Sequence, residues 1–189
     1  MKRIVLALVA VAFLAAIVAG GIRLYRSWRA GEEGGRQAAR QEGVTTGDFR
    51  IIDLYFNDAE GRRLALEARE IPWQSTEEAI RQSLEELIAG PTKRKLAPAV
   101  PGGVRVREVF LRDGVAYVDL TAAVSENHPG GSWSELLTVY ALVNTITENF
   151  PEVDRVQLLI EGKESETLAG HIDISRPLAG RVQLLAGDW

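Results

Sequence analysis

A long apolar run near the start of the sequence constrains this chain more than any other feature. Residues 4–22 are 19 consecutive residues without a charge, and Lys2 and Arg3 precede them. A helix of that length can cross a hydrocarbon core of about 30 Å. We therefore expect residues 4–22 to insert in a membrane, and residues 1–29 to form a transmembrane signal-anchor with its flanks.

Two other interpretations of this run stay open. A cleaved signal peptide has an apolar region of about 7–15 residues, shorter than this one, although Ala19 and Gly20 are small enough to suit cleavage. A buried helix of a soluble protein is the third interpretation. Tyr25 and Trp28 favour the anchor, because amphipathic aromatic side chains settle at the depth of the lipid headgroups.

Charge does not decide the orientation of this segment. Lys2 and Arg3 favour a cytoplasmic N-terminus, but several arginines follow the run and favour the opposite: Arg23, Arg26, Arg29, Arg36 and Arg40. Residues 30–47 are rich in glycine and charge, so we expect a mobile tether there. A short surface helix over residues 36–41 is the alternative, given the good helix formers in that stretch.

Composition limits the rest of the chain to one ordinary domain. The 189 residues are 46% apolar and 25% charged, which suits a single domain with an appendage. The net charge of −4, with dispersed basic residues, argues against nucleic acid as a partner. The absence of cysteine excludes thiol catalysis, thiolate metal sites and lipid attachment to cysteine.

The pattern from residue 48 onward predicts two strands, a helix, two strands, a helix and a strand. Strands are expected at 49–57, at 63–71 with Pro72 as the stop, at 104–111, at 115–120 and at 156–160. Capping boxes at Ser75–Glu78 and Ser132–Glu135 open helices that end at Gly90 and near Phe150. We expect an α+β fold, with a mixed or antiparallel sheet carrying both helices on one face. The domain would occupy residues 48–178, and the tail 179–189 would either add an edge strand or lie loose.

Few residues suggest chemistry. His128 lies in a turn-like loop and lacks the context of a nucleophilic triad. His171 and Asp173, two positions apart in an extended segment, could face a metal ion or substrate, with Asp119 or Glu161 as further acids. The competing interpretation is that His171 packs on the sheet and donates a hydrogen bond, since a single His-x-Asp lacks the ligands of a closed metal site.

Asn144 and Thr145 are unusual in the second helix, because both side chains compete for backbone hydrogen bonds and favour caps and turns. They could satisfy buried backbone groups of a neighbouring loop or contact a ligand or subunit. The candidate structural or binding residues are therefore Asn144, Thr145, Gly162, Gly170, His171 and Asp173. We expect no catalytic residues, no metal and no cofactor.

Several motifs, in their order and spacing, resemble the GerMN domain family. They are LYFNDAEG at residues 54–61, the helix end ELIAGP at 86–91, NTITE at 144–148, IEGK at 160–163 and GHID at 170–173. The resemblance covers about residues 49–178. It implies a small extracytoplasmic module of bacterial sporulation and germination proteins, and of anchored proteins in other bacteria. Related ring-building folds share an αββαβ core, which residues 75–161 reproduce, so self-association or partner binding follows by analogy.

We therefore expect a non-catalytic, membrane-anchored protein of the cell envelope whose domain lies outside the cytoplasm, in the periplasm or at the cell surface. Its partners would be a second copy, an envelope protein or a component of the cell wall. The alternative is a hydrolase or metal-dependent enzyme that uses His171 and Asp173. The alternative predicts that these side chains meet in one cleft.

Overall fold

The structure is a computed structural model that describes residues 48–185. Its elements are β1 (Asp48–Asp58), β2 (Leu64–Trp73), α2 (Thr76–Ala89), β3 (Leu96–Ala97), β4 (Val106–Arg112), β5 (Val115–Leu120), α3 (Ala123–Glu126), α4 (Ser132–Thr147), β6 (Arg155–Ile160) and the 3₁₀ helix η1 (Val182–Leu184). The expected anchor at 4–22, the tether at 30–47 and the last four residues lie outside this range. No helix in the described range has the length and apolar character to cross a membrane.

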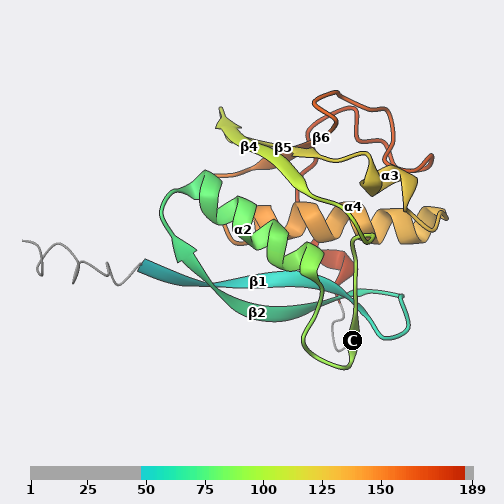
Figure 1. The fold of residues 1–189 in the computed structure, drawn as a ribbon, viewed down its shortest axis with the longest axis horizontal. Coiled ribbons are helices and arrows are strands. Elements are labelled where there is room, and N and C mark those ends of the chain that lie inside the picture. Colours follow the sequence, from blue (N-terminus) through green and yellow to red (C-terminus); the bar gives the residue numbers. More distant parts are fainter. Residues whose placement is uncertain (1–47, 186–189) are drawn as a thin grey trace, which may run out of the picture. The chain divides into compact units, whose positions relative to one another are not determined.

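The fold is α+β, but the expected single sheet with two helices on one face is wrong. The strands form two sheets, in the orders β2-β1-β3 and β4-β5-β6. Figure 1 shows α2 and α4 in a layer between them, with the β1–β2 hairpin on one side and β4, β5 and β6 on the other. A helix between two sheets must be apolar on both sides, and α4 has eleven buried residues among its sixteen.

The order from α2 to β6 is the expected αββαβ, with β3 and α3 as short additions. Strands β4 and β5 pair antiparallel across the Asp113-Gly114 turn, and β5 pairs parallel with β6. The crossover between the parallel strands contains α4, as parallel pairing requires a long connection. This arrangement places the N-terminal end of α4 beside the chain that follows β6.

Helix α2 begins as the sequence predicts. The Ser75 hydroxyl accepts a hydrogen bond from the Glu78 amide at 3.2 Å, which satisfies one of the unpaired N–H groups of the first turn. The Glu78 carboxylate accepts from the Gln82 side chain at 3.0 Å, so the structure forms the serine half of the predicted capping box. Gly90, with φ of 96°, ends the helix.

The second predicted capping box is wrong. Helix α4 starts after Gly131, whose φ is 88°, and no side chain caps its first turn. Glu135 reaches instead toward a loop that is distant in sequence, because that loop offers several backbone amides that have no strand partner.

Strand β2 continues through the predicted stop at Pro72. Pro72 lies opposite Phe49, and strand β2 ends at Trp73. In an antiparallel pair, hydrogen-bonded and non-hydrogen-bonded positions alternate. The missing N–H of Pro72 falls at a non-hydrogen-bonded position and interrupts no ladder bond.

Candidate functional site

Glu135, near the start of α4, holds the loop that contains His171. Its carboxylate is fully buried and accepts from the amides of Ala169, His171 and Ile172 at 2.7, 2.9 and 3.1 Å. Burial by itself would raise the pKa of Glu135. The hydrogen bonds from the Ala169 and Ile172 amides and from His171 outweigh burial and hold that pKa below its usual range. Glu135 is therefore an ionised group that fixes a loop.

The imidazole of His171 completes this arrangement. Its Nδ1 lies 2.9 Å from a carboxylate oxygen of Glu135, so Nδ1 carries the proton and donates it to that oxygen. The side chain is 46% exposed, and within residues 48–185 its Nε2 has no hydrogen-bond partner. A histidine oriented by a carboxylate is one part of a nucleophilic triad, but the described chain places no hydroxyl within hydrogen-bond reach of Nε2.

Asp173 and His171 bond to different partners. Asp173 is exposed, and its Oδ1 accepts from the Ser175 amide at 2.9 Å and from the Ser175 hydroxyl at 2.6 Å. These two bonds lower the pKa of Asp173. Gly170, with φ of 105°, allows the turn that precedes His171, and its amide donates to the Thr167 hydroxyl. Asp173 thus stabilises its own turn while His171 faces Glu135.

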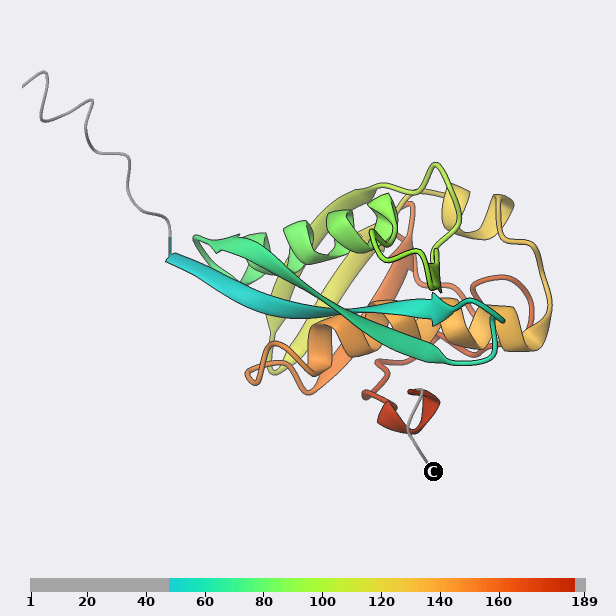
Figure 2. The ribbon, with the colours of Figure 1, turned by 90° about the horizontal axis from the view of Figure 1, so that it is seen from below.

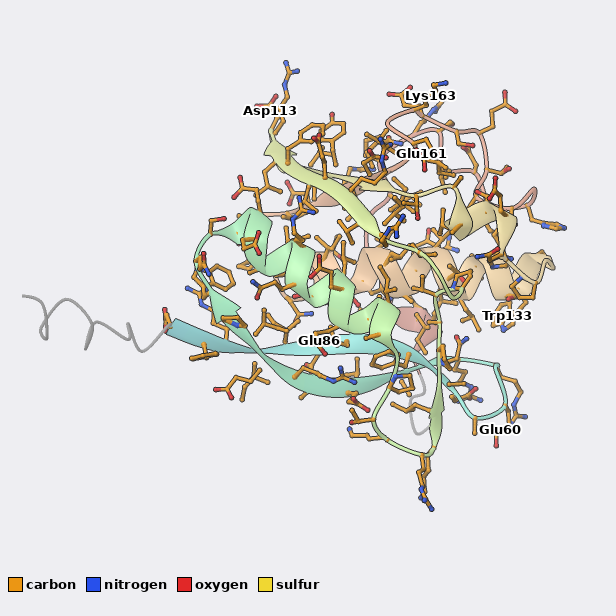
Figure 3. All side chains as sticks on the ribbon, viewed as in Figure 1. Glu60, Glu86, Asp113, Trp133, Glu161 and Lys163 are labelled. Atoms are coloured by element: carbon orange, nitrogen blue, oxygen red, sulfur yellow. The ribbon has the colours of Figure 1, made fainter. Side chains whose placement is uncertain are left out.

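Asp119 and Gly162 meet at the end of β5, around an arginine. The Gly162 amide donates to Asp119 at 2.7 Å, and Arg107 lies 3.0 Å from the other oxygen of Asp119. Arg107 also lies 3.3 Å from Glu161, which appears beside Lys163 at the turn after β6 in Figure 3. A cation between the two carboxylates occupies the position that a metal ion would need. In the described chain no cluster of three or more metal-binding side chains exists.

His128 is part of a separate hydrogen-bond chain. Its Nδ1 accepts from the Gly130 amide at 3.0 Å, so a neutral ring carries its proton on Nε2 and donates it to the Thr138 hydroxyl at 3.3 Å. Thr138 in turn donates to the carbonyl of Ala99. Burial lowers the pKa of His128. This histidine links the loop before α4 to the loop after β3.

Asn144 fastens the C-terminal segment to α4. The fully buried amide accepts from the Arg181 N–H at 2.7 Å and donates to the Arg181 carbonyl at 3.2 Å. Two hydrogen bonds to one residue hold the chain in a fixed register before η1. Asn144 therefore contacts the backbone of its own chain.

Thr145, with Asn149 beyond the end of the helix, contacts the edge of β1. The Thr145 hydroxyl accepts from the Tyr55 amide at 3.3 Å, and Asn149 bonds both the N–H and the C=O of Asp53 at 2.9 and 2.8 Å. These side chains take the place that a neighbouring strand would fill. The C-terminal end of α4 thus closes part of an open sheet edge.

Sequence reasoning missed the residues that position the segment after β6. The Ser132–Glu135 pattern predicts Glu135 as a capping residue, although a glutamate within a helix that is apolar on all sides indicates a buried partner. Gln157 is 2% exposed and donates to the Ile174 carbonyl at 2.9 Å. No sequence pattern around Asn149, which lies beyond the helix end, predicts its contact with β1. Only tertiary structure supplies the backbone groups that these side chains satisfy.

The described chain is thus a small α+β domain in which two sheets enclose two helices, and residues 48–185 contain no group of three or more side chains that could hold a metal ion. A sequence model of the Germane family, described as sporulation and spore germination, matches residues 53–166. The chain belongs to this family. A comparison with curated proteins gives no match.

Solved structures show the same fold. The first GerMN domain of the sporulation protein GerM from Bacillus subtilis is 26% identical with a TM-score of 0.54, and the match covers 69% of this chain and 97% of that one. The tandem GerMN domains of GerM are 24% identical with a TM-score of 0.57, covering 70% of this chain and 46% of that one. The likeness is therefore to one domain of the tandem pair.

A third structure, from a protein of Clostridium perfringens titled as a lipoprotein, is 21% identical with a TM-score of 0.52. That match covers 72% of this chain and 89% of the other. At this identity it supports the fold alone. The GerMN resemblance expected from the sequence motifs is confirmed by the family match and by the two GerM structures.

Proposed function

We propose that this chain is a non-catalytic, membrane-anchored protein of the cell envelope whose GerMN domain binds a partner or assembles with itself. The observation that carries the proposal is the use of the candidate site residues. Glu135, His171 and Asn144 bond to the backbone or side chains of their own fold. A catalytic site would instead need such groups to contact a substrate. Because these polar side chains bind segments of the domain itself, the domain would act through its surface.

The outer face of the β1–β2 hairpin supplies such a surface. Directly opposed residues share a face of an antiparallel pair, and Phe49, Ile51 and Leu66 lie on the face away from α2. These side chains are 50%, 77% and 40% exposed. We call this set, with the exposed Ala68 that lies opposite Asp53, the outer strip. Exposed apolar side chains gathered on one sheet face are typical of a docking surface.

The envelope location rests on the relatives and on the sequence. The similar proteins are titled as a lipoprotein and as a sporulation protein. In this chain the apolar residues 4–22 would replace a lipid as the anchor, and residues 30–47 would separate the membrane from the domain. The domain would then work outside the cytoplasm, at a short distance from the membrane.

Capture by the full chain in its own membranes tests this function. The full chain and an Ile51→Asp, Leu66→Asp variant would be crosslinked in membranes and purified in detergent. We expect a second copy of the chain or a defined envelope protein to copurify with the full chain, and we expect the variant to lose this copurifying protein. A His171→Ala chain serves as the control and should retain the same material, because the His171 imidazole bonds Glu135 and is not part of the outer strip. Absence of any species dependent on the outer strip would contradict the proposal.

A further inference from the structure

We propose that two copies of this chain pair through the free edge of β1, antiparallel about a two-fold axis at Arg50. The pairing would join two β1–β2 hairpins into one four-stranded sheet. This inference rests on the proposed function and specifies its partner as a second copy.

The hydrogen bonds of β1 show which of its residues face the free edge. The N–H and C=O of Asp53 bond to Asn149, and the N–H of Tyr55 bonds to Thr145, so both residues point away from β2. Backbone groups alternate in direction along an antiparallel strand. Phe49 and Ile51, four and two residues before Asp53, therefore point the same way. The position of Pro72 opposite Phe49 agrees, since Phe49 needs no bond from β2 there.

These outward groups are unpaired. Within residues 48–185 the backbone N–H and C=O of Phe49 and Ile51 have no hydrogen-bond partner at this edge. Strand β3 pairs only with Asn57 and Asp58, at the other end of β1. Figure 2 looks onto the hairpin and shows no helix or strand along the first half of β1 on the edge away from β2. An open edge of this kind accepts an additional strand.

The side chain of Asn149 limits how an added strand can align. Because it occupies both backbone groups of Asp53, the new ladder must end before that residue. Two residues, Phe49 and Ile51, then remain available in each copy. Only a two-fold register about Arg50 pairs both of them, with Phe49 opposite the partner's Ile51 and Ile51 opposite the partner's Phe49. That register makes four backbone hydrogen bonds.

The side chains suit the same register. Phe49 and the partner's Ile51 fall on one face, so four exposed apolar side chains gather around the axis. On the opposite face, Asp48 lies diagonal to the partner's Arg50, and opposite charges at this spacing attract. Arg50 would face its own copy across the axis, but its guanidinium stacks on Trp73, 3.4 Å from the ring centroid, on the β2 side. Self-complementarity in hydrogen bonds, apolar side chains and charge is what selects a second copy as the occupant.

Disulfide crosslinking tests the register directly, because the chain has no cysteine of its own. In the proposed pairing, Arg50→Cys faces itself at a non-hydrogen-bonded position, where Cβ atoms approach to about 4.5–5.5 Å. Ile51→Cys faces the partner's Phe49 and lies about 7–8 Å from its own copy. We expect the full-length Arg50→Cys chain in membranes to form disulfide dimers at least about tenfold faster than Ile51→Cys, since bond formation needs close Cβ atoms. Glu60→Cys, at the exposed hairpin turn in Figure 3, is the background control.

A proline substitution tests the ladder without disturbing the monomer. The N–H of Ile51 points to the free edge, so Ile51→Pro removes two intermolecular hydrogen bonds and no bond to β2. We expect the dimer dissociation constant of the full chain in detergent, measured by analytical ultracentrifugation, to rise about tenfold or more. Ile51→Val keeps the N–H and the apolar surface and should dissociate like the parent. Unchanged circular dichroism and melting temperature would show that both variants are folded.

The outcomes separate this inference from the proposed function. Equal crosslinking at positions 50, 51 and 60, or a monomer whose Phe49 and Ile51 amides are protected from hydrogen exchange, would overturn pairing with a second copy. If such a monomer still captures an envelope protein through the outer strip, the proposed function survives. A chain that neither pairs nor captures a partner would contradict both.

Discussion

Helices α2 and α4 lie in one layer and pack against each other, yet they are held by different means. Helix α2 has one buried stripe, an exposed face and a serine cap that directly precedes it in sequence. Helix α4 is buried along most of its length, and its polar side chains reach across the fold to Ala169, Tyr55 and Arg181. The first helix is specified by local signals, whereas the second is specified by the segments that surround it.

This difference explains why Asn144 and Thr145 could suggest a ligand or subunit contact in the sequence. Glu135, Asn144 and Thr145 are polar groups at buried positions, and buried polar groups must find partners. In an enzyme those partners include the substrate. In this domain they are backbone groups of a loop, a strand edge and the C-terminal segment, so the same pattern serves to hold the fold together.

Removal of Glu135 should have the largest effect. Glu135→Ala leaves three loop amides and the His171 imidazole without their acceptor, and we expect the free energy of unfolding to fall by about 3–5 kcal/mol. Urea denaturation of the full chain in detergent measures the change. Glu126→Ala, at an exposed position of α3, should change stability by less than about 0.5 kcal/mol. Equal effects in the two variants would show that α4 needs no distant partner.

Acid should weaken the attachment of the loop that follows α2. Glu67 accepts from Arg69 and from the Lys93 and Thr92 amides. Burial opposes its ionised form, but these bonds outweigh burial and lower the pKa of Glu67 from its ordinary 4.5 to about 2.

Because the folded state binds the proton less tightly than the unfolded state, this contribution is complete above pH 4.5. It is lost as the pH falls from about 4.5 to about 2. Unfolding measured across this range should show the decline, and Glu67→Gln should be less stable at neutral pH with a flatter profile below pH 4.5. A parallel decline in the parent and the variant would assign the acid sensitivity to other carboxylates.

Loss of Asn144 should release the C-terminal segment from α4. Asn144→Ala removes both hydrogen bonds to Arg181, and we expect a loss of about 1–3 kcal/mol because partly buried backbone groups lose their partner. Hydrogen exchange at the Arg181 amide, with urea denaturation, measures the local and global effects. Thr147→Ala is the matched control, since the Thr147 hydroxyl donates to the Val143 carbonyl of its own helix rather than to Arg181. Slow exchange at Arg181 in the Asn144 variant would mean that other contacts hold the segment.

The two predicted capping serines should differ by a smaller amount. Ser75→Ala removes a side-chain cap of α2 and should cost about 1 kcal/mol. Ser132→Ala should change stability by less than about 0.5 kcal/mol, because α4 has no side-chain cap. Thermal unfolding of both variants compares them directly. A larger loss at Ser132 would reverse the contrast between the helices.

Local patterns predicted the elements well. The strand expected at residues 115–120 has those bounds in the structure, and the helix opened by Ser75 ends at Gly90 as its glycine indicates. Alternation and capping are properties of short stretches, so the sequence reveals them. The stop at Pro72 was wrong because the effect of proline depends on which edge its nitrogen faces, and that depends on the partner strand.

By itself the sequence determined the order of helices and strands, the first helix cap and the resemblance to the GerMN family, because each depends on residues close together in the chain. Tertiary structure decided that two sheets enclose the helices, that Glu135 binds the His171 loop, and that Asn149 bonds Asp53 at the edge of β1. The partner of a buried carboxylate or a strand edge lies tens of residues away. The fold, rather than any short motif, brings the two together.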